Sequence, residues 1–177
     1  MKYTLPFLLL ACSGAQTDDE KPEDTETEEN QPETNEPEDT EDTITENDLV
    51  INELLAKSDE TDDWVELHNP TDAAIDLSEW GLVDDYGEDD PWMFPAGSTI
   101  GAGEHIIVWA NDGEGPEGEY SASFKLSSDG ETLHLVDING LSVQSVDFPA
   151  MDPENSYAKI GEIWEVTDSP TPGESNQ

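Results

Sequence analysis

The sequence predicts an all-β domain, a sandwich or a barrel, preceded by a segment that does not fold. After Asp48, short apolar runs recur about every 8 to 15 residues between Gly, Pro, Asn and Asp, which is typical of all-β architectures. No amphipathic helix longer than two turns is evident in the sequence. Only 33% of the 177 residues are hydrophobic, so part of the chain lacks the side chains needed for a core.

The charge balance excludes one large class of partners. The chain has 45 Asp and Glu against 5 Lys, no Arg, and a formal net charge of -40. Nucleic acids are bound by basic surfaces that neutralise phosphates, and bidentate phosphate contacts need a guanidinium. We therefore expect no nucleic acid partner.

Residues 1–11 predict a lipoprotein signal peptide. A lysine precedes a short apolar run, and Leu9-Leu10-Ala11 leads directly into Cys12, which resembles the bacterial lipobox. The run is too short to span a bilayer. We expect the chain to be cut before Cys12 and a lipid to be attached to its thiol, which anchors the protein to a membrane. An ordinary cleaved signal is the alternative.

By resemblance to known sorting signals, Ser13 after the cysteine indicates the outer membrane of a bacterial cell envelope, on the periplasmic side or at the surface. The inner membrane is the alternative. Cys12 is the only cysteine of the chain. Its lipidation would leave no thiol for disulfides, zinc thiolate sites or cysteine catalysis.

Residues 12–47 predict an acidic disordered linker. Nearly all of them are Asp, Glu, Thr, Pro, Asn or Gln, and Ile44 is the only large apolar side chain, so no core can form. A flexible coil of this length reaches roughly 30–35 Å, and repulsion between its carboxylates extends it further. The linker would lift the folded domain, residues 48–177, away from the lipid, or serve only as a soluble spacer.

The strands of that domain follow from its apolar runs and turn residues. The expected strands, in chain order, are Leu49–Ala56, Trp64–Asn69, Ala74–Leu77, Gly81–Asp84, Glu104–Ala110, Ser123–Leu126, Thr132–Asp137, Leu141–Phe148, Ser156–Ile160 and Ile163–Val166.

Three of these segments carry further detail. Leu133 and Leu135 alternate with His134, which should point outward. The run His105–Trp109 is apolar on both faces, as in a central strand covered on both sides. In Leu141–Phe148 the apolar phase shifts near Gln144-Ser145, which predicts a bulge.

Between the last two of those strands, Ile138-Asn139-Gly140 predicts a hairpin turn, because Asn and Gly adopt the backbone conformation that tight hairpins need.

Seven short motifs stand in a fixed order along the domain: Asn52-Glu53, Trp64–Pro70, Asp76–Leu82, Phe94–Gly97, Phe124–Ser127, Gly130–Leu133 and Ser169–Gly173. Together they resemble the lamin tail domain family over Leu49 to about Asn176. The resemblance implies an immunoglobulin-like β-sandwich that binds or scaffolds and has no catalytic site of its own. Lys159 stands where the family usually has arginine, which puts a bidentate pairing there in doubt.

The residues with catalytic potential form no recognised catalytic motif. His68, His105 and His134 lie on separate strands without metal-binding spacing or an adjacent nucleophile. Glu53 lies inside an apolar strand, so it should bind backbone amides or a lysine. An active-site role for Glu53 is the alternative.

Acidic loops raise the question of calcium. One loop offers carboxylates beside Gly87, and Ca²⁺ prefers several carboxylate and carbonyl oxygens. The spacing does not match the twelve-residue helix–loop–helix motif, so a solvated acidic surface is the alternative. The candidate ligands are Asp84, Asp85, Glu88, Asp89 and Asp90.

The domain also has five tryptophans, a residue that stacks on sugars. Most of them lie beside apolar core signals. Trp92 follows the acidic loop and is the one expected to be an exposed platform.

These observations predict a non-enzymatic, membrane-anchored lipoprotein that displays its β-sandwich as an adhesion, scaffold or envelope-interaction module. A calcium-dependent carbohydrate- or protein-binding domain is the alternative, and a small extracytoplasmic hydrolase is a third hypothesis. The protein or glycan ligand stays unknown at this stage.

Overall fold

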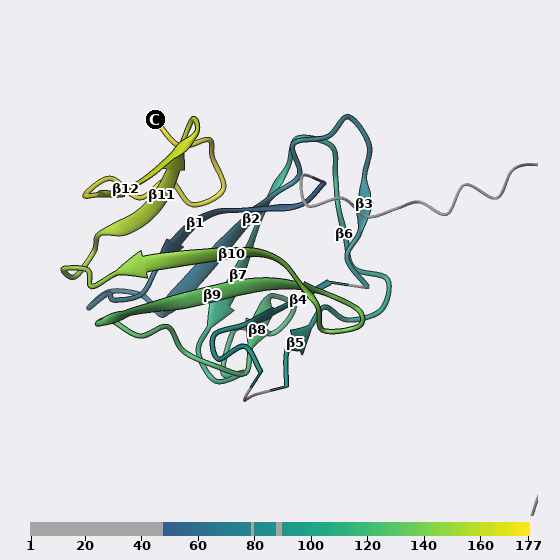
Figure 1. Cartoon of the computed structure of the whole chain (residues 1–177), viewed down its shortest axis with the longest axis horizontal. Helices are drawn as coiled ribbons and strands as arrows, with labels where there is room; N and C mark the ends of the chain where they lie inside the picture. Colours follow the sequence, from purple (N-terminus) through teal and green to yellow (C-terminus); the bar gives the residue numbers. More distant parts are fainter. Residues whose placement is uncertain (1–47, 79, 88–89) are drawn as a thin grey trace, which may run out of the picture. The chain divides into compact units, whose positions relative to one another are not determined.

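Three β-sheets make up the part of the chain that the computed structural model describes, residues 48–78, 80–87 and 90–177 (Figure 1). The predictions for residues 1–47, namely the signal peptide, the lipid on Cys12 and the linker, lie outside this part. The twelve strands are β1 (Val50–Leu55), β2 (Asp63–His68), β3 (Ile75–Asp76), β4 (Trp80–Val83), β5 (Trp92–Met93), β6 (Thr99–Ile100), β7 (His105–Ala110), β8 (Tyr120–Ala122), β9 (Gly130–Asp137), β10 (Ser142–Pro149), β11 (Ser156–Ile160) and β12 (Ile163–Thr167).

Two of the sheets face each other and confirm the predicted immunoglobulin-like sandwich. The first has six strands in the order β12-β11-β1-β2-β7-β8, and the second has four in the order β10-β9-β4-β5. Strands β3 and β6 form a small third sheet at one end (Figure 1). All pairs are antiparallel except β7 and β8.

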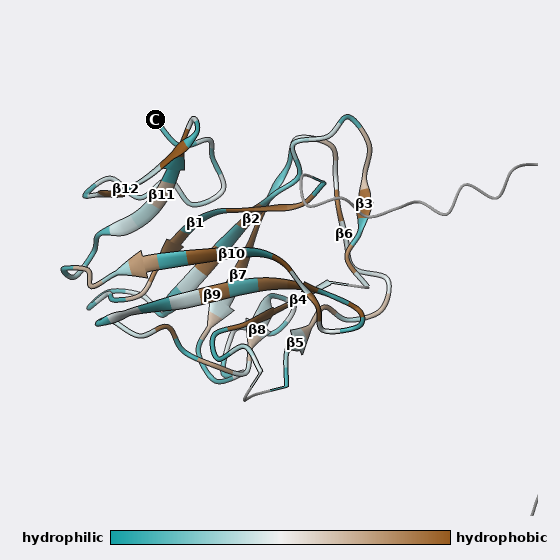
Figure 2. Cartoon of the chain, in the orientation of Figure 1, coloured by the Kyte–Doolittle hydropathy of each residue, from teal (hydrophilic) through white to brown (hydrophobic). Residues whose placement is uncertain are grey.

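The core is formed by alternate side chains of the two large sheets. Leu54, Val65 and Leu67 come from β1 and β2, and Leu133 and Leu135 from β9, and all five are fully buried. Figure 2 shows hydrophobic and hydrophilic positions succeeding one another along β9 and β10. This alternation is expected where one face of a strand meets the core and the other meets solvent.

The β9–β10 hairpin confirms two predictions. Gly140 has a φ of 74° and its amide donates to Asp137 O at 2.9 Å, so the Asn139-Gly140 turn is present. The β10 register shifts between Ser142 and Gln144, as the change of apolar phase indicated. Gln144 Oε1 accepts a hydrogen bond from the Ile51 amide at 2.9 Å. The bulge therefore turns a polar side chain toward the other sheet.

One predicted strand is wrong. Ser123–Leu126 is not a strand, and the strand in this region is Tyr120–Ala122 instead. Leu126 is buried and Phe124 packs against the core, which explains the apolar signal. The segment therefore shows that apolar spacing reports burial, while strand formation also needs a backbone partner.

The prediction that His105–Trp109 is covered on both sides is also wrong. Val108 is buried, but His105, Ile107 and Trp109 on the opposite face keep intermediate exposure. Strand β7 lies inside the sheet order, next to the three-residue strand β8, but one of its two faces stays partly exposed to solvent.

The short strands β5 and β6, with two residues each, were not predicted because so short a run has no periodicity.

No helix within residues 48–78, 80–87 and 90–177 is long and apolar enough to cross a membrane.

Candidate functional site

The outer face of the six-stranded sheet carries different chemistry at its two ends. Strands β2 and β7 pair residue by residue, with Trp64 opposite Trp109 and His68 opposite His105. Because side chains alternate along a strand, these residues share the face that points away from the core. The two pairs are four positions apart along β2, a spacing of roughly 13 Å.

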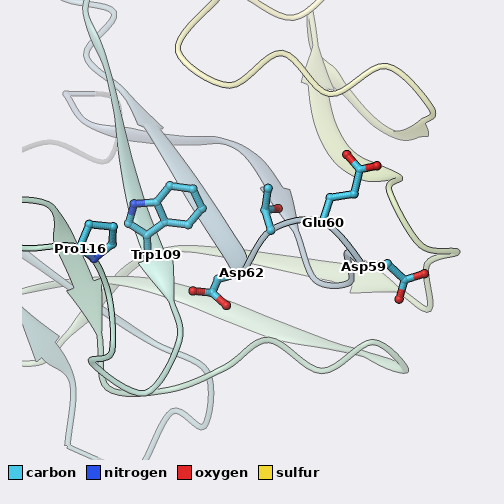
Figure 3. Close-up of a pocket in the computed structure, with 6 residues that line it drawn as sticks. Asp59, Glu60, Asp62, Trp109 and Pro116 are labelled. Atoms are coloured by element: carbon cyan, nitrogen blue, oxygen red, sulfur yellow. The ribbon is translucent and has the colours of Figure 1, made fainter.

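At the tryptophan end lies an open pocket of about 480 Å³. Its walls come from the β1–β2 loop, from β7 and from the segment that follows β7 (Figure 3). In Figure 3 the Trp109 ring lies between Pro116 and the acidic loop. The lining residues are Asp59, Glu60, Thr61, Asp62, Trp109 and Pro116.

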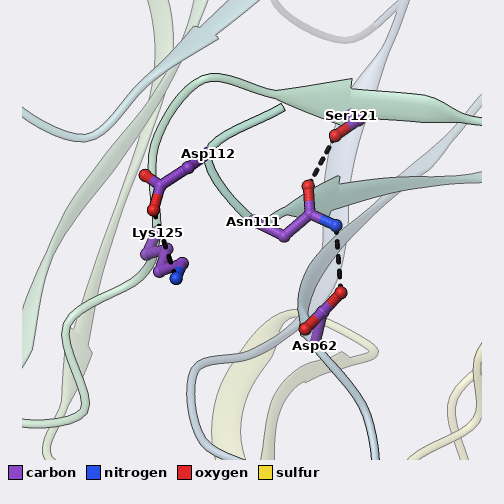
Figure 4. A network of polar contacts seen from close by, with 5 residues as sticks. All are labelled: Asp62, Asn111, Asp112, Ser121 and Lys125. Carbon is purple, nitrogen blue, oxygen red and sulfur yellow. Dashed lines mark hydrogen bonds and ion pairs between the residues drawn. The ribbon is translucent and has the colours of Figure 1, made fainter. Parts of the chain in front are cut away.

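A polar bridge ties the two walls of this pocket together. Asn111 Nδ2 donates to Asp62 Oδ2 at 3.0 Å, and Asn111 Oδ1 accepts from the Ser121 hydroxyl (Figure 4). Ser121 Oγ also accepts from the Gly115 amide at 3.1 Å. Asn111 is nearly fully buried, so these bonds hold the β1–β2 loop against the segment after β7.

Glu154 fixes the other side of the acidic loop. Its Oε1 accepts from the Asp59 amide at 2.6 Å and its Oε2 from the Ser58 hydroxyl at 2.8 Å. Ser58 Oγ in turn accepts from the amides of Glu60 and Thr61 at 3.0 and 2.9 Å. The loop backbone is thereby held in place, while Asp59 and Glu60 stay exposed.

The charged residues that line the pocket are all acidic, and one of them, Asp62, also interacts electrostatically with Lys125, which does not line it. Trp109 Nε1 donates to Glu119, which adds a fourth carboxylate at the rim. None of the six lining residues is cationic. Lys125 forms an exposed ion pair with Asp112 at 3.1 Å (Figure 4), and this hydrogen bond raises the pKa of Lys125. The pocket thus has Trp109 on one side and the carboxylates of the β1–β2 loop on the other, with Asp62 next to the ring (Figure 3).

A second group of carboxylates on the same sheet is buried. Glu53 on β1 and Glu66 on β2 face each other in the sheet register, and both are fully buried. The C-terminal segment, residues 168–177, supplies donors to both. Glu53 accepts from the Ser156 hydroxyl, from Thr171 N at 3.1 Å and from Thr171 Oγ1 at 3.0 Å. The prediction that Glu53 binds backbone amides is confirmed.

Glu66 depends on the same segment. It accepts from Asn52 Nδ2 at 2.7 Å and from the Gly173 amide. Burial, with a smaller contribution from the Glu53 charge, raises the pKa of Glu66 to about 6 against the lowering effect of these two hydrogen bonds. Asn176 Nδ2 adds two more hydrogen bonds between the C-terminal segment and the sheet, to Asn52 O at 2.9 Å and to Lys159 O at 3.0 Å.

The residues predicted to bind calcium lie in the β4–β5 connection. Asp84, Asp85 and Asp90 are described there, whereas Glu88 and Asp89 lie outside the described residues. In the part of the chain that the structure describes, no three His, Cys, Asp or Glu are placed to hold a metal ion. With two of its five ligands undescribed, calcium binding at this loop stays a prediction.

The tryptophan that lines a pocket is a different one from that expected to be exposed. The prediction of Trp92 as an exposed platform is wrong, since its ring packs edge-on against Phe94 and Tyr120 with centroids 4.8 and 6.4 Å apart. Trp109 lines the pocket instead. Its sequence signal was its place on the opposite phase of β7 from the buried Val108 and Ala110.

The three histidines also gain neighbours that the sequence did not reveal. His68 and His105 stack with ring centroids 4.3 Å apart and planes 9° apart. His134 lies half-exposed on β9, as predicted for an outward position, and stacks on Tyr86 at 4.7 Å. Pairing of the first two depends on the β2–β7 register, which no local pattern specifies.

Comparison with known proteins agrees with the architecture. Residues 43–150 match the Lamin Tail Domain family, a range that covers more than half of the 177 residues. The chain belongs to the lamin tail domain family. Lamin tail domains are immunoglobulin-like interaction domains and are not typically enzymes. No curated protein matches the sequence.

Within this lamin tail domain, the family match includes the Trp109 pocket with both of its walls. The C-terminal segment that covers Glu53 and Glu66 lies beyond the matched range.

Proposed function

We propose that this lamin tail domain is a protein-interaction module that binds a lysine- or arginine-bearing segment of a partner protein in the Trp109 pocket. The observation that carries the proposal is the combination of one open tryptophan face with three carboxylates, Asp59, Glu60 and Asp62, and no cation among the lining residues.

The chemistry of the pocket suits a cationic side chain. An ammonium or guanidinium group over an indole face gains about 0.5–1 kcal/mol at an exposed site and more when it loses water. Carboxylates beside the ring add charge-assisted hydrogen bonds. The volume of about 480 Å³ lies in the usual range for ligand pockets, roughly 300–1,000 Å³.

The charge of the whole domain supports the same class of partner. Of the 45 acids, 16 lie between residues 13 and 48, and the other 29 lie in residues 49–177, which contain only Lys57, Lys125 and Lys159 as cations. Such an excess attracts positively charged partners and speeds their association at low salt. The pocket then supplies the short-range contacts that select a binding site.

The pocket supports binding more than catalysis. Its six lining residues include no histidine, cysteine or lysine. Three carboxylates and the Thr61 hydroxyl are present, but among the described residues no hydrogen bond joins a carboxylate of the pocket to that hydroxyl, as an activated nucleophile would need. The hydrolase hypothesis therefore gains nothing from this site. Calcium-dependent binding of a glycan by the same domain is kept as an arm of the experiment.

Display on a membrane is part of the proposal and rests on the sequence around Cys12. We expect the lipid on Cys12 to hold the domain at the bacterial envelope, with the acidic linker between them. A Cys12→Ala variant should move from the membrane fraction to the soluble fraction. Unchanged fractionation would remove the anchor from the proposal and leave the binding site untouched.

The binding site is tested by calorimetric titration of the full chain with a short peptide that carries two lysines. Trp109→Ala should weaken binding about five- to tenfold, because it removes the cation–π face. Trp109→Phe, which keeps an aromatic ring, should weaken it less. The same peptide with acetylated lysines is the matched control, since acetylation removes the charge.

Two results would overturn the proposed site. One is equal affinity of the lysine peptide for the wild-type chain and for Trp109→Ala. The other is equal affinity of the acetylated and unmodified peptides. Binding of a glycan that requires Ca²⁺ and ignores both peptides would favour the alternative function.

A further inference from the structure

The opposite end of β2 and β7 holds a concentration of basic groups that the acidic composition does not suggest. His68 and His105 stack in parallel on the outer face of the sheet. Lys159 on β11 lines a pocket of about 480 Å³ together with His68. The other lining residues are Val50, Asn52, Pro70, Thr71 and Gly161.

These basic side chains have no competing partners. Among the described residues, no hydrogen bond or ion pair engages the imidazole of His68, the imidazole of His105 or the ammonium of Lys159. Lys125, by contrast, is paired with Asp112. Asn52 Nδ2 gives one hydrogen bond to Glu66 and has a second N–H to offer. His68, Lys159 and Asn52 therefore bring three donor groups to one pocket, and His105 stacks on the ring of His68.

Positive charge dominates the immediate surroundings of His68. Burial lowers its pKa, and so do the charges of His105 and Lys159. The carboxylates on neighbouring elements are Glu53 on β1, Glu66 on β2, Asp72 after β2, Glu104 before β7 and Glu174 in the C-terminal segment. Glu53, Glu66 and Glu104 accept hydrogen bonds from other groups. Among the described residues, none of these five carboxylates forms an ion pair with His68, His105 or Lys159.

We propose that the pocket beside His68 and Lys159 binds an oxyanion, the carboxylate, phosphate or sulfate group of a small ligand. Lys159 supplies a permanent positive charge, and the stacked rings of His68 and His105 supply N–H donors that become cationic as the pH falls. The site is independent of the Trp109 pocket, because it uses other residues at the far end of the same two strands.

The anion has a physical role in this arrangement. Two stacked imidazolium rings beside an ammonium group repel one another, which disfavours protonation. An anion between them offsets that repulsion, so it binds the protonated rings more tightly than the neutral rings. By linkage, binding must tighten as the pH falls through the range in which the histidines take up protons.

The test is a titration of the full chain with sodium sulfate, followed by the NMR signals of the histidine rings, with sodium chloride at equal ionic strength as the blank. The signals of His68 and His105 should shift saturably, with binding at least tenfold tighter at pH 5.5 than at pH 7.5. His134, whose ring stacks on Tyr86 on another sheet, is the internal control and should not follow sulfate.

Variants of two lysines provide the matched comparison. Lys159→Gln should weaken sulfate binding at least fivefold, whereas Lys125→Gln should leave it unchanged. Sodium acetate in place of sulfate shows whether a carboxylate or a tetrahedral anion is preferred, and saturable binding of either supports the site. The proposal fails if His134 responds to sulfate as His68 does, or if Lys159→Gln binds sulfate as well as the wild-type chain.

Discussion

Carboxylates occur in two groups on the outer side of the six-stranded sheet, and the two groups differ in almost every physical respect. Glu53 and Glu66 are fully buried and accept hydrogen bonds from the C-terminal segment. Asp59 and Glu60 are exposed in the wall of the pocket opposite Trp109, and no hydrogen bond to their carboxylates is present among the described residues. Buried carboxylates therefore stabilise the fold at Glu53 and Glu66, whereas the exposed carboxylates at Asp59 and Glu60 are available to bind a ligand.

The comparison shows that burial and nearby hydrogen-bond donors determine whether an Asp or Glu carboxylate stabilises the fold or stays available for binding. A buried carboxylate is tolerated only where hydrogen bonds replace the water it has lost. An exposed carboxylate keeps its water and contributes little to stability. The excess of acids in this chain therefore does not identify a site until burial and hydrogen-bond partners are known.

The sharpest way to break this comparison is to remove one buried carboxylate. Glu53→Ala should lower the free energy of unfolding by about 3–5 kcal/mol, because the Ser156 and Thr171 donors lose their acceptor. Urea denaturation of the full chain measures the loss. Glu60→Ala, at the exposed group, should change it by no more than about 0.5 kcal/mol. Equal effects of the two substitutions would contradict the distinction.

A smaller change tests the contribution of the C-terminal segment. Thr171→Val keeps the shape of the side chain but removes the hydroxyl that donates to Glu53. The expected loss of stability is about 1–2 kcal/mol. Thr99→Val is the matched control, because Thr99 is exposed on β6, and it should be near neutral. A Thr171→Val protein as stable as the control would show that the hydrogen bond from Thr171 to Glu53 does not contribute to the stability of the fold.

The pH dependence of stability should separate Glu66 from the exposed acids. Its pKa is raised from 4.5 to about 6 in the folded protein, so between these values the folded state binds more protons at this residue than the unfolded state does. The contribution of Glu66 is therefore full below pH 4.5 and is lost as the pH rises through about 6. Glu66→Gln removes this dependence.

We accordingly expect the stability of Glu66→Gln, relative to the wild-type chain, to rise between pH 4.5 and pH 7.5. Urea midpoints at the two pH values give the comparison, and Glu60→Gln serves as the exposed control. A relative stability of Glu66→Gln that is the same at both pH values would mean that Glu66 titrates like a solvated acid.

The smallest expected effect concerns the exposed acids together. Mutual repulsion of exposed carboxylates destabilises a compact state, and salt screens it with a Debye length of about 10 Å at 0.1 M. The melting temperature of the full chain should rise by a few degrees between dilute buffer and 0.2 M NaCl. An equal rise with CaCl₂ and MgCl₂ at matched ionic strength would count against calcium binding at Asp84, Asp85 and Asp90.

Much of the fold could be predicted because its signals are local. The Asn139-Gly140 turn, the bulge in β10 and the alternation of Leu133 and Leu135 each depend on a few neighbouring residues. The strand predicted at Ser123–Leu126 was wrong because its apolar residues are buried without a strand partner. Local pattern reports burial well and backbone pairing less well.

The candidate site was less accessible to the same reasoning. Glu53 could be assigned a structural role from its position within an apolar strand, without knowledge of Thr171, which lies 118 residues away. The Trp109 pocket and the His68–His105 pair depend on the register of β2 against β7, across about forty residues of sequence. No periodicity in the sequence encodes that register. The sequence therefore favoured Trp92, which follows the acidic loop, over Trp109 as the exposed platform.

The most direct test of the proposed interaction site uses two pairs of charge-neutralising substitutions in the full chain. Asp59→Asn with Glu60→Gln removes two charges beside Trp109, and Glu162→Gln with Glu165→Gln removes two exposed charges at β12. Both variants have the same net charge, so long-range attraction falls equally. Calorimetric titration with the two-lysine peptide should show at least fivefold weaker binding for the first variant than for the second. Equal affinity of the two variants would contradict a binding site at Trp109 and reduce the acidic loop to a solvated surface.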